Sequence, residues 1–238
     1  MGLTPYSLAC ESSVDTMKKM VCLEEHGYIL SPLDIVWGAG NPFSSSEKTN
    51  EIFNYLFNEK GLSVNAIEEK YGFTPLHPAC SSESIFGMKW LVEHKADISS
   101  FDRSGQTPFM WACKSSINRS AKVRYLVEKG ANCQAKDYKG NTALFHATYN
   151  SSKCEDDEVK DVLRYLVIEK GININSVDKE GRTPLLYACE EHPSFLVIQQ
   201  LIELGADVSF RNKNKKMQHI VAESFSSIDA SVIDLLID

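Results

Sequence analysis

The sequence predicts an all-α solenoid, a stack of about six to seven helix pairs. Three observations predict it: one seven-residue segment recurs five times, an apolar helical segment follows each strong copy, and glycine commonly ends that segment. A single helix pair cannot cover its own apolar faces, so neighbouring pairs must stack. The recurring segment reads TPYSLAC from Thr4, TPLHPAC from Thr74, TPFMWAC from Thr107, TALFHAT from Thr142 and TPLLYAC from Thr183, with looser copies from Ser31 and Met217.

Each strong copy is expected to begin one helix and to precede a second. Thr74, Thr107 and Thr183 are each followed by a proline. Threonine at such a place caps a helix by accepting a backbone N–H, and proline fits the first helical position because the N–H it lacks would have no partner there. The second helix carries an apolar stripe, as in Tyr-Leu-Val at 125–127. The glycines expected to end second helices are Gly130, Gly171 and Gly205.

This pattern resembles the ankyrin repeat, D-x-x-G-x-T-P-L-H-x-A followed by a helix that ends LLxxGA. The resemblance is strong from about Glu68 to Ser209, degenerate before that stretch and weak after Phe210. It implies a single ankyrin-repeat domain over 1–238, with β-hairpin finger loops between the helix pairs. The expected segments are a degenerate N-terminal helix pair (1–30), an irregular repeat (31–67), repeats at 68–100 and 101–135, a repeat with an acidic insertion (136–176), a repeat at 177–209 and an atypical C-terminal repeat (210–238).

The composition is that of an ordinary soluble protein, with 238 residues, of which 43% are hydrophobic and 24% charged. The net charge of −7 argues against a whole-molecule preference for nucleic acid or for an anionic membrane. No apolar run approaches the roughly 20 residues that span a bilayer, and the amino terminus lacks the pattern of a signal peptide. We therefore expect no nucleic-acid partner and no membrane partner.

The seven cysteines form no CxxC pair and no Cys/His cluster with zinc-ligand spacing. Their odd number, without a signal peptide, fits a reducing compartment, either the cytoplasm or the nucleus. Four of them occupy one place in the repeat, where the family has a small residue, and we expect them to be buried as small hydrophobes. These four are Cys10, Cys80, Cys113 and Cys189.

The sequence shows no recognisable enzyme motif. The six histidines form neither HExxH nor a triad order, and no phosphate-binding glycine pattern is present. We therefore expect a non-enzyme without cofactor or metal. Only His77 matches the motif histidine, and the resemblance implies that it hydrogen-bonds between repeats. The acidic run at 155–158 is expected to be a solvated loop, with a calcium or basic-partner site as the alternative.

The resemblance implies that the fingers and first helices form a concave surface that binds another protein. Aromatic and arginine side chains supply interface energy at such positions. The plainer interpretation is a set of solvated finger residues, with Phe73 and Phe101 stabilising the hairpins. The candidate partner-binding residues are Tyr71, Phe73, Phe101, Arg103, Gln106, Lys114, Tyr138, Lys139, Tyr149, Lys179, Arg182, Arg211 and Lys213.

The finger positions become more basic towards the C-terminal end, from Lys136 to Lys216. The acidic insertion is expected at the opposite end of the helices. A partner with an acidic stretch should therefore be drawn to the last fingers. We expect the chain itself to be a monomer.

The leading functional hypothesis is a non-catalytic recognition module or scaffold. The alternatives are a regulatory or targeting arm of a larger enzyme or channel, and a pathogen effector that engages host proteins. The chain begins with a helix and stops before a glycine turn, so it is either capped in this way or a piece of a longer array. The resemblance also implies that Asn65 and Asn175 lie where ankyrin repeats can be hydroxylated, and the sequence leaves open whether they are.

Overall fold

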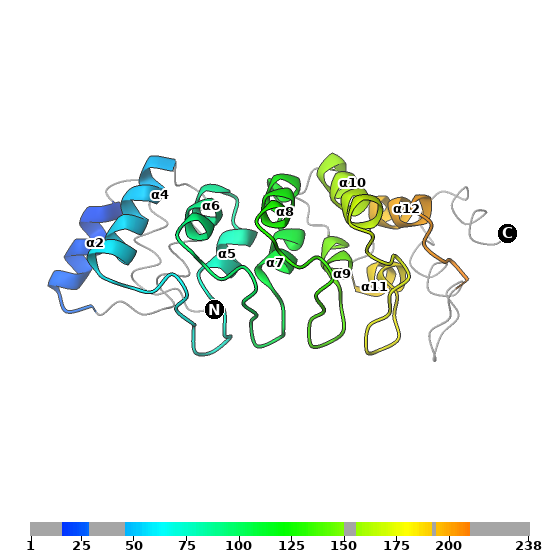
Figure 1. The fold of residues 1–238 in the computed structure, drawn as a ribbon, viewed down its shortest axis with the longest axis horizontal. Helices are drawn as coiled ribbons and strands as arrows, with labels where there is room; N and C mark the ends of the chain where they lie inside the picture. Colours follow the sequence, from blue (N-terminus) through cyan, green and yellow to red (C-terminus); the bar gives the residue numbers. More distant parts are fainter. Residues whose placement is uncertain (1–15, 29–45, 150–155, 192–193, 210–238) are drawn as a thin grey trace. The chain divides into compact units, whose positions relative to one another are not determined.

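The structure, a computed structural model, describes residues 16–28, 46–149, 156–191 and 194–209 (Figure 1). The chain forms two compact units that divide between Ala131 and Asn132. Within the described ranges both units consist of helices and connecting loops, without a strand. None of the described helices is long and apolar enough to cross a membrane.

The first unit contains two helix pairs that follow two further helices. The pairs are α5 (Leu76–Ser81) with α6 (Phe86–Glu93), and α7 (Pro108–Lys114) with α8 (Arg119–Glu128). The preceding helices are α2 (Thr16–Glu25) and α4 (Ser46–Phe53), and α4 continues as the π-helix η1 (Asn54–Glu59). We call the first helix of each pair the inner helix and the second the outer helix, and we count α4 with η1, which contacts α6, among the outer helices. The finger loops extend beyond the inner helices (Figure 1).

The second unit repeats this arrangement. Its helices are α9 (Ala143–Ala147), α10 (Asp156–Arg164) continuing as the π-helix η2 (Tyr165–Glu169), α11 (Pro184–Glu191) and α12 (Phe195–Glu203). The interpretation of the acidic run as a loop is wrong for its last three residues, because residues 156–158 form the first turn of α10. Carboxylates are stabilised near a helix N-terminus by the unpaired N–H groups there. Glu155 lies outside the described residues.

Two of the three predicted threonine caps are present. The hydroxyl of Thr107 accepts the N–H of Met110 at 3.4 Å, and that of Thr183 accepts the N–H of Leu186 at 3.3 Å. The cap prediction is wrong for Thr74, because its hydroxyl lies 3.1 Å from Nδ1 of His77 and makes no cap to a backbone N–H. The motif histidine thus competes with the helix for the threonine side chain.

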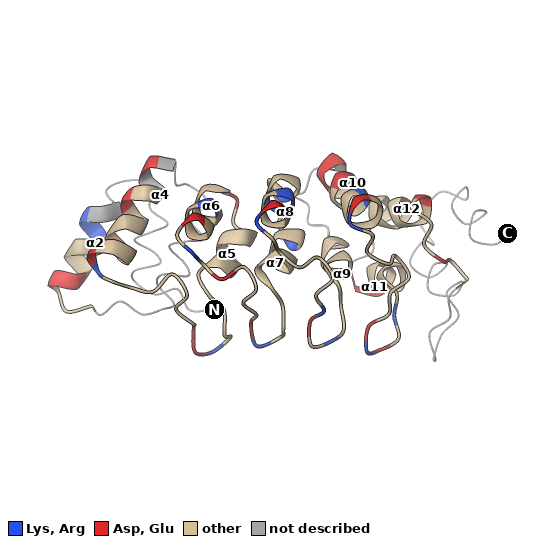
Figure 2. Cartoon of the chain, viewed as in Figure 1, with Lys and Arg blue, Asp and Glu red and all other residues tan. Residues whose placement is uncertain are grey.

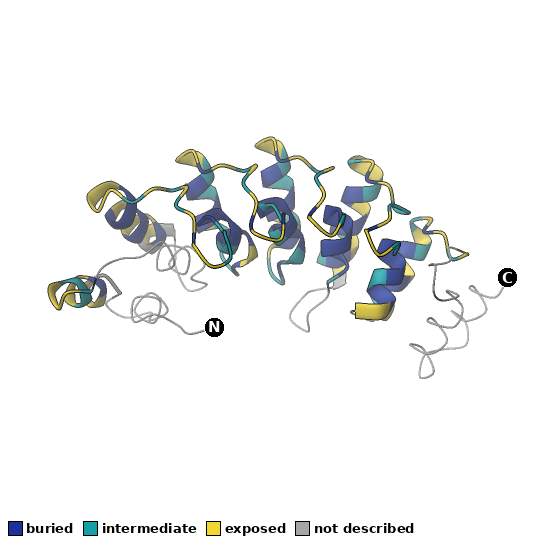
Figure 3. Cartoon of the chain, turned by 90° about the horizontal axis from the view of Figure 1, so that it is seen from below, coloured by how far each residue is buried: buried dark blue, intermediate teal, exposed yellow. Residues whose placement is uncertain are grey.

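The core of each unit lies between its inner and outer helices, where residues of both are buried (Figure 3). Cys80, Cys113 and Cys189 are buried free thiols, which confirms their prediction as small hydrophobes, whereas Cys10 lies outside the described residues. Burial raises the pKa of the Cys80 thiol far above its usual range and that of Cys189 to about 12. Neither thiol is an available nucleophile at neutral pH, because the thiolate is the reactive form.

Three outer helices end in one repeated contact. A lysine ammonium lies over a tyrosine ring at 5.0 Å for Lys60 and Tyr55, at 5.4 Å for Lys129 and Tyr125, and at 5.0 Å for Lys170 and Tyr165. The lysine follows the tyrosine by four residues in α8 and by five in η1 and η2. The π-helical turns absorb the additional residue and so retain the contact.

Candidate protein-binding surface

Each finger is a tight loop held by a buried carboxylate at its base. Three fingers contain an aspartate whose N–H donates to the C=O four residues later at 3.0 Å: Asp102 to Gln106, Asp137 to Asn141 and Asp178 to Arg182. A glycine N–H returns to the aspartate C=O in each of them. Instead of an extended β-ladder, the described fingers contain one isolated antiparallel bridge, between Lys136 and Thr142. Arms this short leave no room for further ladder bonds.

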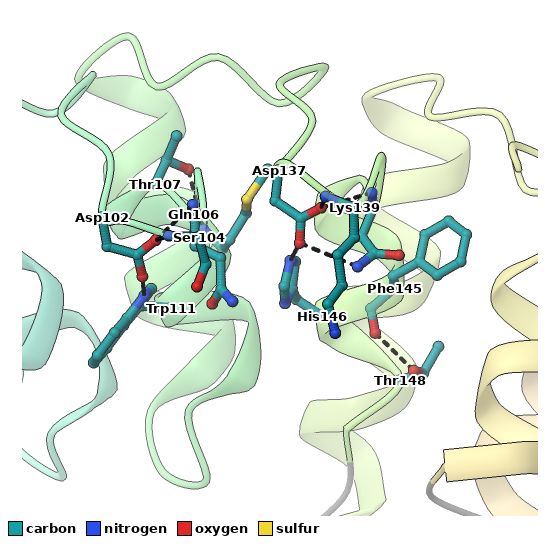
Figure 4. A network of polar contacts seen from close by, with 12 residues as sticks. Asp102, Ser104, Gln106, Thr107, Trp111, Asp137, Lys139, Phe145, His146 and Thr148 are labelled. Carbon is teal, nitrogen blue, oxygen red and sulfur yellow. Dashed lines mark hydrogen bonds and ion pairs between the residues drawn. The ribbon is translucent and has the colours of Figure 1, made fainter. Parts of the chain in front are cut away.

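The aspartate side chain closes the loop a second time. Oδ1 of Asp102 accepts the N–H groups of Ser104 and Gln106 at 2.8 and 2.9 Å, and Oδ1 of Asp137 accepts those of Lys139 and Asn141 at 2.9 Å each (Figure 4). Such charge-assisted bonds to backbone donors are among the stronger hydrogen bonds in proteins. The carboxylates of these aspartates are therefore buried against the finger backbone and are not exposed on the finger surface.

The second carboxylate oxygen meets a different donor in each finger. At Asp137, Nε2 of His146 donates at 3.1 Å and Nδ2 of Asn141 also donates at 3.1 Å. Burial works against the charged form of this carboxyl, but the bonds from His146 and Asn141 more than offset it and lower its pKa. The donors to the other two aspartates are Nε1 of Trp111 to Asp102 at 3.1 Å and Nε of Arg182 to Asp178 at 2.8 Å.

The first finger has one more residue than the others and a glutamate in place of the aspartate. Oε1 of Glu68 accepts the N–H of Lys70 at 2.9 Å, and Oε2 accepts that of Tyr71 at 2.6 Å. The N–H of Glu68 donates to the C=O of Phe73, five residues on, at 2.9 Å. The longer side chain thus spans the longer loop.

Neighbouring fingers within a unit are joined by one backbone hydrogen bond. The N–H of Arg103 donates to the C=O of Tyr71 at 2.8 Å, and the N–H of Lys179 donates to the C=O of Lys139 at 2.8 Å. The glycine after each accepting finger residue has a positive φ, +75° at Gly72 and +86° at Gly140, and a Cβ there would meet the next finger at about 3 Å. Each unit therefore presents a pair of fingers whose spacing is fixed before any partner arrives.

The first unit presents aromatic side chains on this scaffold. The rings of Tyr71 and Phe73 stack with centroids 5.3 Å apart, and the edge of Trp111 on α7 meets Phe73 at 5.1 Å. These three side chains are partly exposed, while Phe101 is 62% exposed. The hairpin-stabilising interpretation therefore fits Phe73, whereas Phe101 presents most of its ring to solvent.

Trp111 is a residue that the sequence reasoning did not select. It lies on the inner helix, holds Asp102 through its indole N–H and completes the aromatic row. Its place in the repeat, two residues before the small-residue position, also carries His146 and Tyr187. Comparing the copies at that one position would have indicated it.

Two other candidate binding residues of the first unit, Gln106 and Arg103, form hydrogen bonds within the unit. The C=O of Gln106 accepts Nε2 of His77 at 3.1 Å, which confirms the hydrogen bond between repeats that the resemblance implies for His77. Burial lowers the pKa of His77 and favours the neutral ring. The guanidinium of Arg103 donates to the C=O of Glu69 on the neighbouring finger. Lys114, the last residue of α7, is partly exposed.

The second unit presents lysines. Lys136, Lys139 and Lys179 are exposed on its two fingers, and Tyr138 between the first two is 56% exposed. Tyr149, just after α9, is partly exposed. Figure 2 shows basic and acidic residues side by side on these loops. Since Asp137 and Asp178 are buried, the exposed balance of the two fingers is basic.

Arg182 differs from the other predicted cations because carboxylates surround it. Its side chain is 12% exposed and forms ion pairs with Asp178 at 2.8 Å and with Glu191 at 3.0 Å. Glu180 and Glu190 lie within 4 Å of it, and its guanidinium lies over the ring of Tyr187 at 4.9 Å. Its charge is thus compensated within the unit. The remaining two predicted residues, Arg211 and Lys213, lie outside the described residues.

Among the described residues, no group of three or more histidine, cysteine, aspartate or glutamate side chains could hold a metal ion. The carboxylate oxygens of Asp102 and Asp137 are occupied by donors of their own repeats. The exposed side chains of the fingers include Phe101 in the first unit, and Tyr138 and three lysines in the second.

The repeated helix pairs and fingers define a class of protein that sequence comparison confirms. The chain matches the family of ankyrin repeats (3 copies) over residues 43–137, 100–156 and 137–212, and it belongs to that family. Ankyrin repeats are generally protein-protein interaction modules.

Individual relatives share the repeats over part of their length. The chain is 30% identical over 159 residues to Rabankyrin-5 of Mus musculus and 31% identical over 159 residues to Rabankyrin-5 of Homo sapiens. These alignments cover 66% of this chain and 13% of each relative. An ankyrin repeat-containing protein of Schizosaccharomyces pombe is 37% identical over 71 residues, which are 30% of this chain and 32% of that protein.

Proposed function

We propose that this chain is a non-catalytic protein-binding module or scaffold that engages its partner through the fingers and the inner helices. The observation that carries the proposal is the exposure of Phe101 and Tyr138 on fingers that backbone hydrogen bonds already fix. Large aromatic side chains on a rigid support bury much area at little entropic cost. Membership of the ankyrin-repeat family supports the same role.

The proposed partner of the second unit carries an acidic segment. Lys136, Lys139 and Lys179 are exposed, whereas the aspartates beside them are buried and hydrogen-bonded. Among the exposed side chains of these two fingers, the three lysines outnumber Glu180, so their exposed charge is net basic although the whole chain carries a net charge of −7. Such a patch accelerates association with an acidic segment and makes it sensitive to salt.

The test compares partner capture by three versions of the full chain. The first is unchanged, the second carries Lys139→Glu and Lys179→Glu, and the third carries Lys160→Glu and Arg164→Glu on α10. All four residues are exposed, so the two variants change the net charge equally. We expect the finger variant to lose affinity by about tenfold or more at low salt and the α10 variant to retain it. Equal affinity of both variants would contradict the acidic-partner proposal.

A matched pair of alanine substitutions tests the aromatic part of the surface. Phe101→Ala changes the finger, and Phe86→Ala changes the first residue of the outer helix α6, which is 44% exposed. We expect only Phe101→Ala to weaken capture. Retention of the partner by that variant, together with loss in Phe86→Ala, would move the binding surface to the outer helices.

A second candidate is that this array is one arm of a longer protein. Rabankyrin-5 favours it, because the matching segment amounts to 13% of that protein. The binding role proposed above holds in either case. The full open reading frame that encodes this chain decides between the two.

A further inference from the structure

Lys122 on α8 is a fully buried cation at a repeat position that is apolar in the other outer helices. It lies four residues before Leu126, and none of its surface is exposed. The residues four before the corresponding leucines of the other outer helices are apolar and buried: Ile52, Gly87, Val162 and Val197. A lysine in this register therefore needs an explanation that packing alone does not supply.

The ammonium of Lys122 joins two inter-helix turns. It donates to the C=O of Ser82, in the turn after α5, to Oγ of Ser115 at 2.7 Å and to the C=O of Ile117 at 2.9 Å. Ser115 and Ile117 belong to the turn between α7 and α8. These three acceptors are uncharged oxygens, and they come from two consecutive repeats.

Further bonds hold the same two turns together. Arg119, also fully buried, donates through Nε to the C=O of Ser115 at 2.6 Å. Asn118 adopts a left-handed conformation with a φ of +53° and donates through Nδ2 to the C=O of Glu83 at 3.0 Å. The hydroxyl of Ser115 donates onward to the C=O of Ile117 at 3.0 Å. Side chains of α8 and its N-cap thus donate to carbonyls of both turns, and the bonds to the C=O groups of Ser82 and Ser115 are buried.

A buried ammonium costs free energy, and an apolar residue of similar volume commonly serves stability as well or better. What an apolar residue cannot do is donate three hydrogen bonds in fixed directions. We infer that Lys122 is a positioning residue: it fixes the turn at 115–118 against the turn at 82–84, and with it the end of α7 that carries Lys114. The importance of this for binding rests on the proposed function, since Lys114 is a candidate contact.

The first test is Lys122→Met in the full chain, followed by amide hydrogen exchange. Methionine fills the apolar space without donating. We expect exchange at the amides of Ser82 and Ser115 to accelerate by about tenfold or more, because the turns open locally. The amides of Ser104 and Gln106, which Asp102 holds, should keep their rates. Unchanged exchange at both turns would overturn the inference.

The second test is chemical rescue of Lys122→Ala, read by the same two turn amides. The alanine variant leaves the three oxygens without their donor, and n-propylammonium replaces the deleted atoms including the charge. We expect n-propylammonium to restore protection and 1-propanol, of similar size, to fail. Equal rescue by the alcohol would show that filling the space is sufficient and would overturn the inference. Capture by the Phe101→Ala variant tests the proposed function separately, because that substitution lies outside both turns.

Discussion

The finger pair of the first unit carries exposed and half-buried aromatic side chains, whereas that of the second unit carries exposed lysines. Both pairs are built on the same support, a buried carboxylate at the finger base and one backbone bond between neighbours. The comparison teaches that the backbone sets the spacing of the fingers, while the variable positions set which side chains each finger pair exposes. The donor to the second carboxylate oxygen varies in the same way, from indole to imidazole to guanidinium.

The largest effect is expected from removing a base carboxylate. Asp137→Ala removes the acceptor of four donors, the part-buried N–H of Lys139 and the three buried donors of His146 and Asn141. We expect the free energy of unfolding to fall by about 3–5 kcal/mol, because several buried donors lose their shared acceptor at once. Urea denaturation measures it.

Asp157→Ala is the matched control, because that aspartate is exposed at the start of α10. We expect a loss below about 1 kcal/mol from the weaker interaction with the helix terminus. Equal losses in the two variants would show that the carboxylate at the finger base stabilises the fold no more than an exposed aspartate does.

A smaller effect is expected from filling the space between paired fingers. Gly140→Ala places a Cβ 3.2 Å from the backbone nitrogen of Lys179 and keeps a φ of +86°. We expect a loss of at least about 2 kcal/mol. Gly171→Ala, with a φ of +63° and open space around it, should lose only about 1 kcal/mol. Thermal unfolding of both variants compares them, and a larger loss at Gly171 would argue against finger-to-finger contact.

A pH dependence distinguishes the finger whose base aspartate, Asp137, is bonded to a histidine of α9. The folded-state pKa of Asp137 is lowered, so its contribution to stability is present above the unfolded-state pKa and is lost as the pH falls through the folded-state value. We expect His146→Ala to raise the pKa of Asp137, because one of the two donors to Oδ2 is removed. Carbon-13 NMR titration of the Asp137 carboxyl measures the shift. A lower pKa in the variant would contradict this assignment.

The smallest effect on stability is expected at the presented side chains. Phe101→Ala should change the free energy of unfolding by less than about 0.5 kcal/mol, as is usual for exposed positions. Phe73→Ala should cost more, about 1–3 kcal/mol, because its ring packs between Tyr71 and Trp111. Denaturant titration of the two variants orders them. The reverse order would assign Phe101 to the scaffold and Phe73 to the presented surface.

The repeat made the fold predictable from the sequence. The threonine caps at Thr107 and Thr183 and the buried cysteines of the same motif are local consequences of the recurring segment. The π-helical ends could also have been predicted from the sequence. The segment Tyr-Leu-Val-Glu-Lys-Gly at 125–130 corresponds to Tyr-Leu-Val-Ile-Glu-Lys-Gly at 165–171, which is one residue longer. An insertion of one residue before a fixed glycine has to be absorbed within the helix.

The candidate surface was predictable only in outline, because its side chains interact with residues from other elements. Arg182 was selected as a binding cation, and the sequence does not show that Glu190 and Glu191 at the end of α11 turn towards it. The sequence does not distinguish Lys122 from an exposed helix residue, and only the structure shows that it is buried. Such pairings depend on how elements pack, which motif spacing does not encode.

The most direct test of the proposed binding surface is amide hydrogen exchange of the full chain with and without a captured partner. We expect the partner to slow exchange in the fingers, at residues 68–74, 102–107, 137–142 and 178–183, and to leave the outer helices α6, α8, α10 and α12 unchanged. Slowed exchange along the outer helices with unprotected fingers would contradict the account.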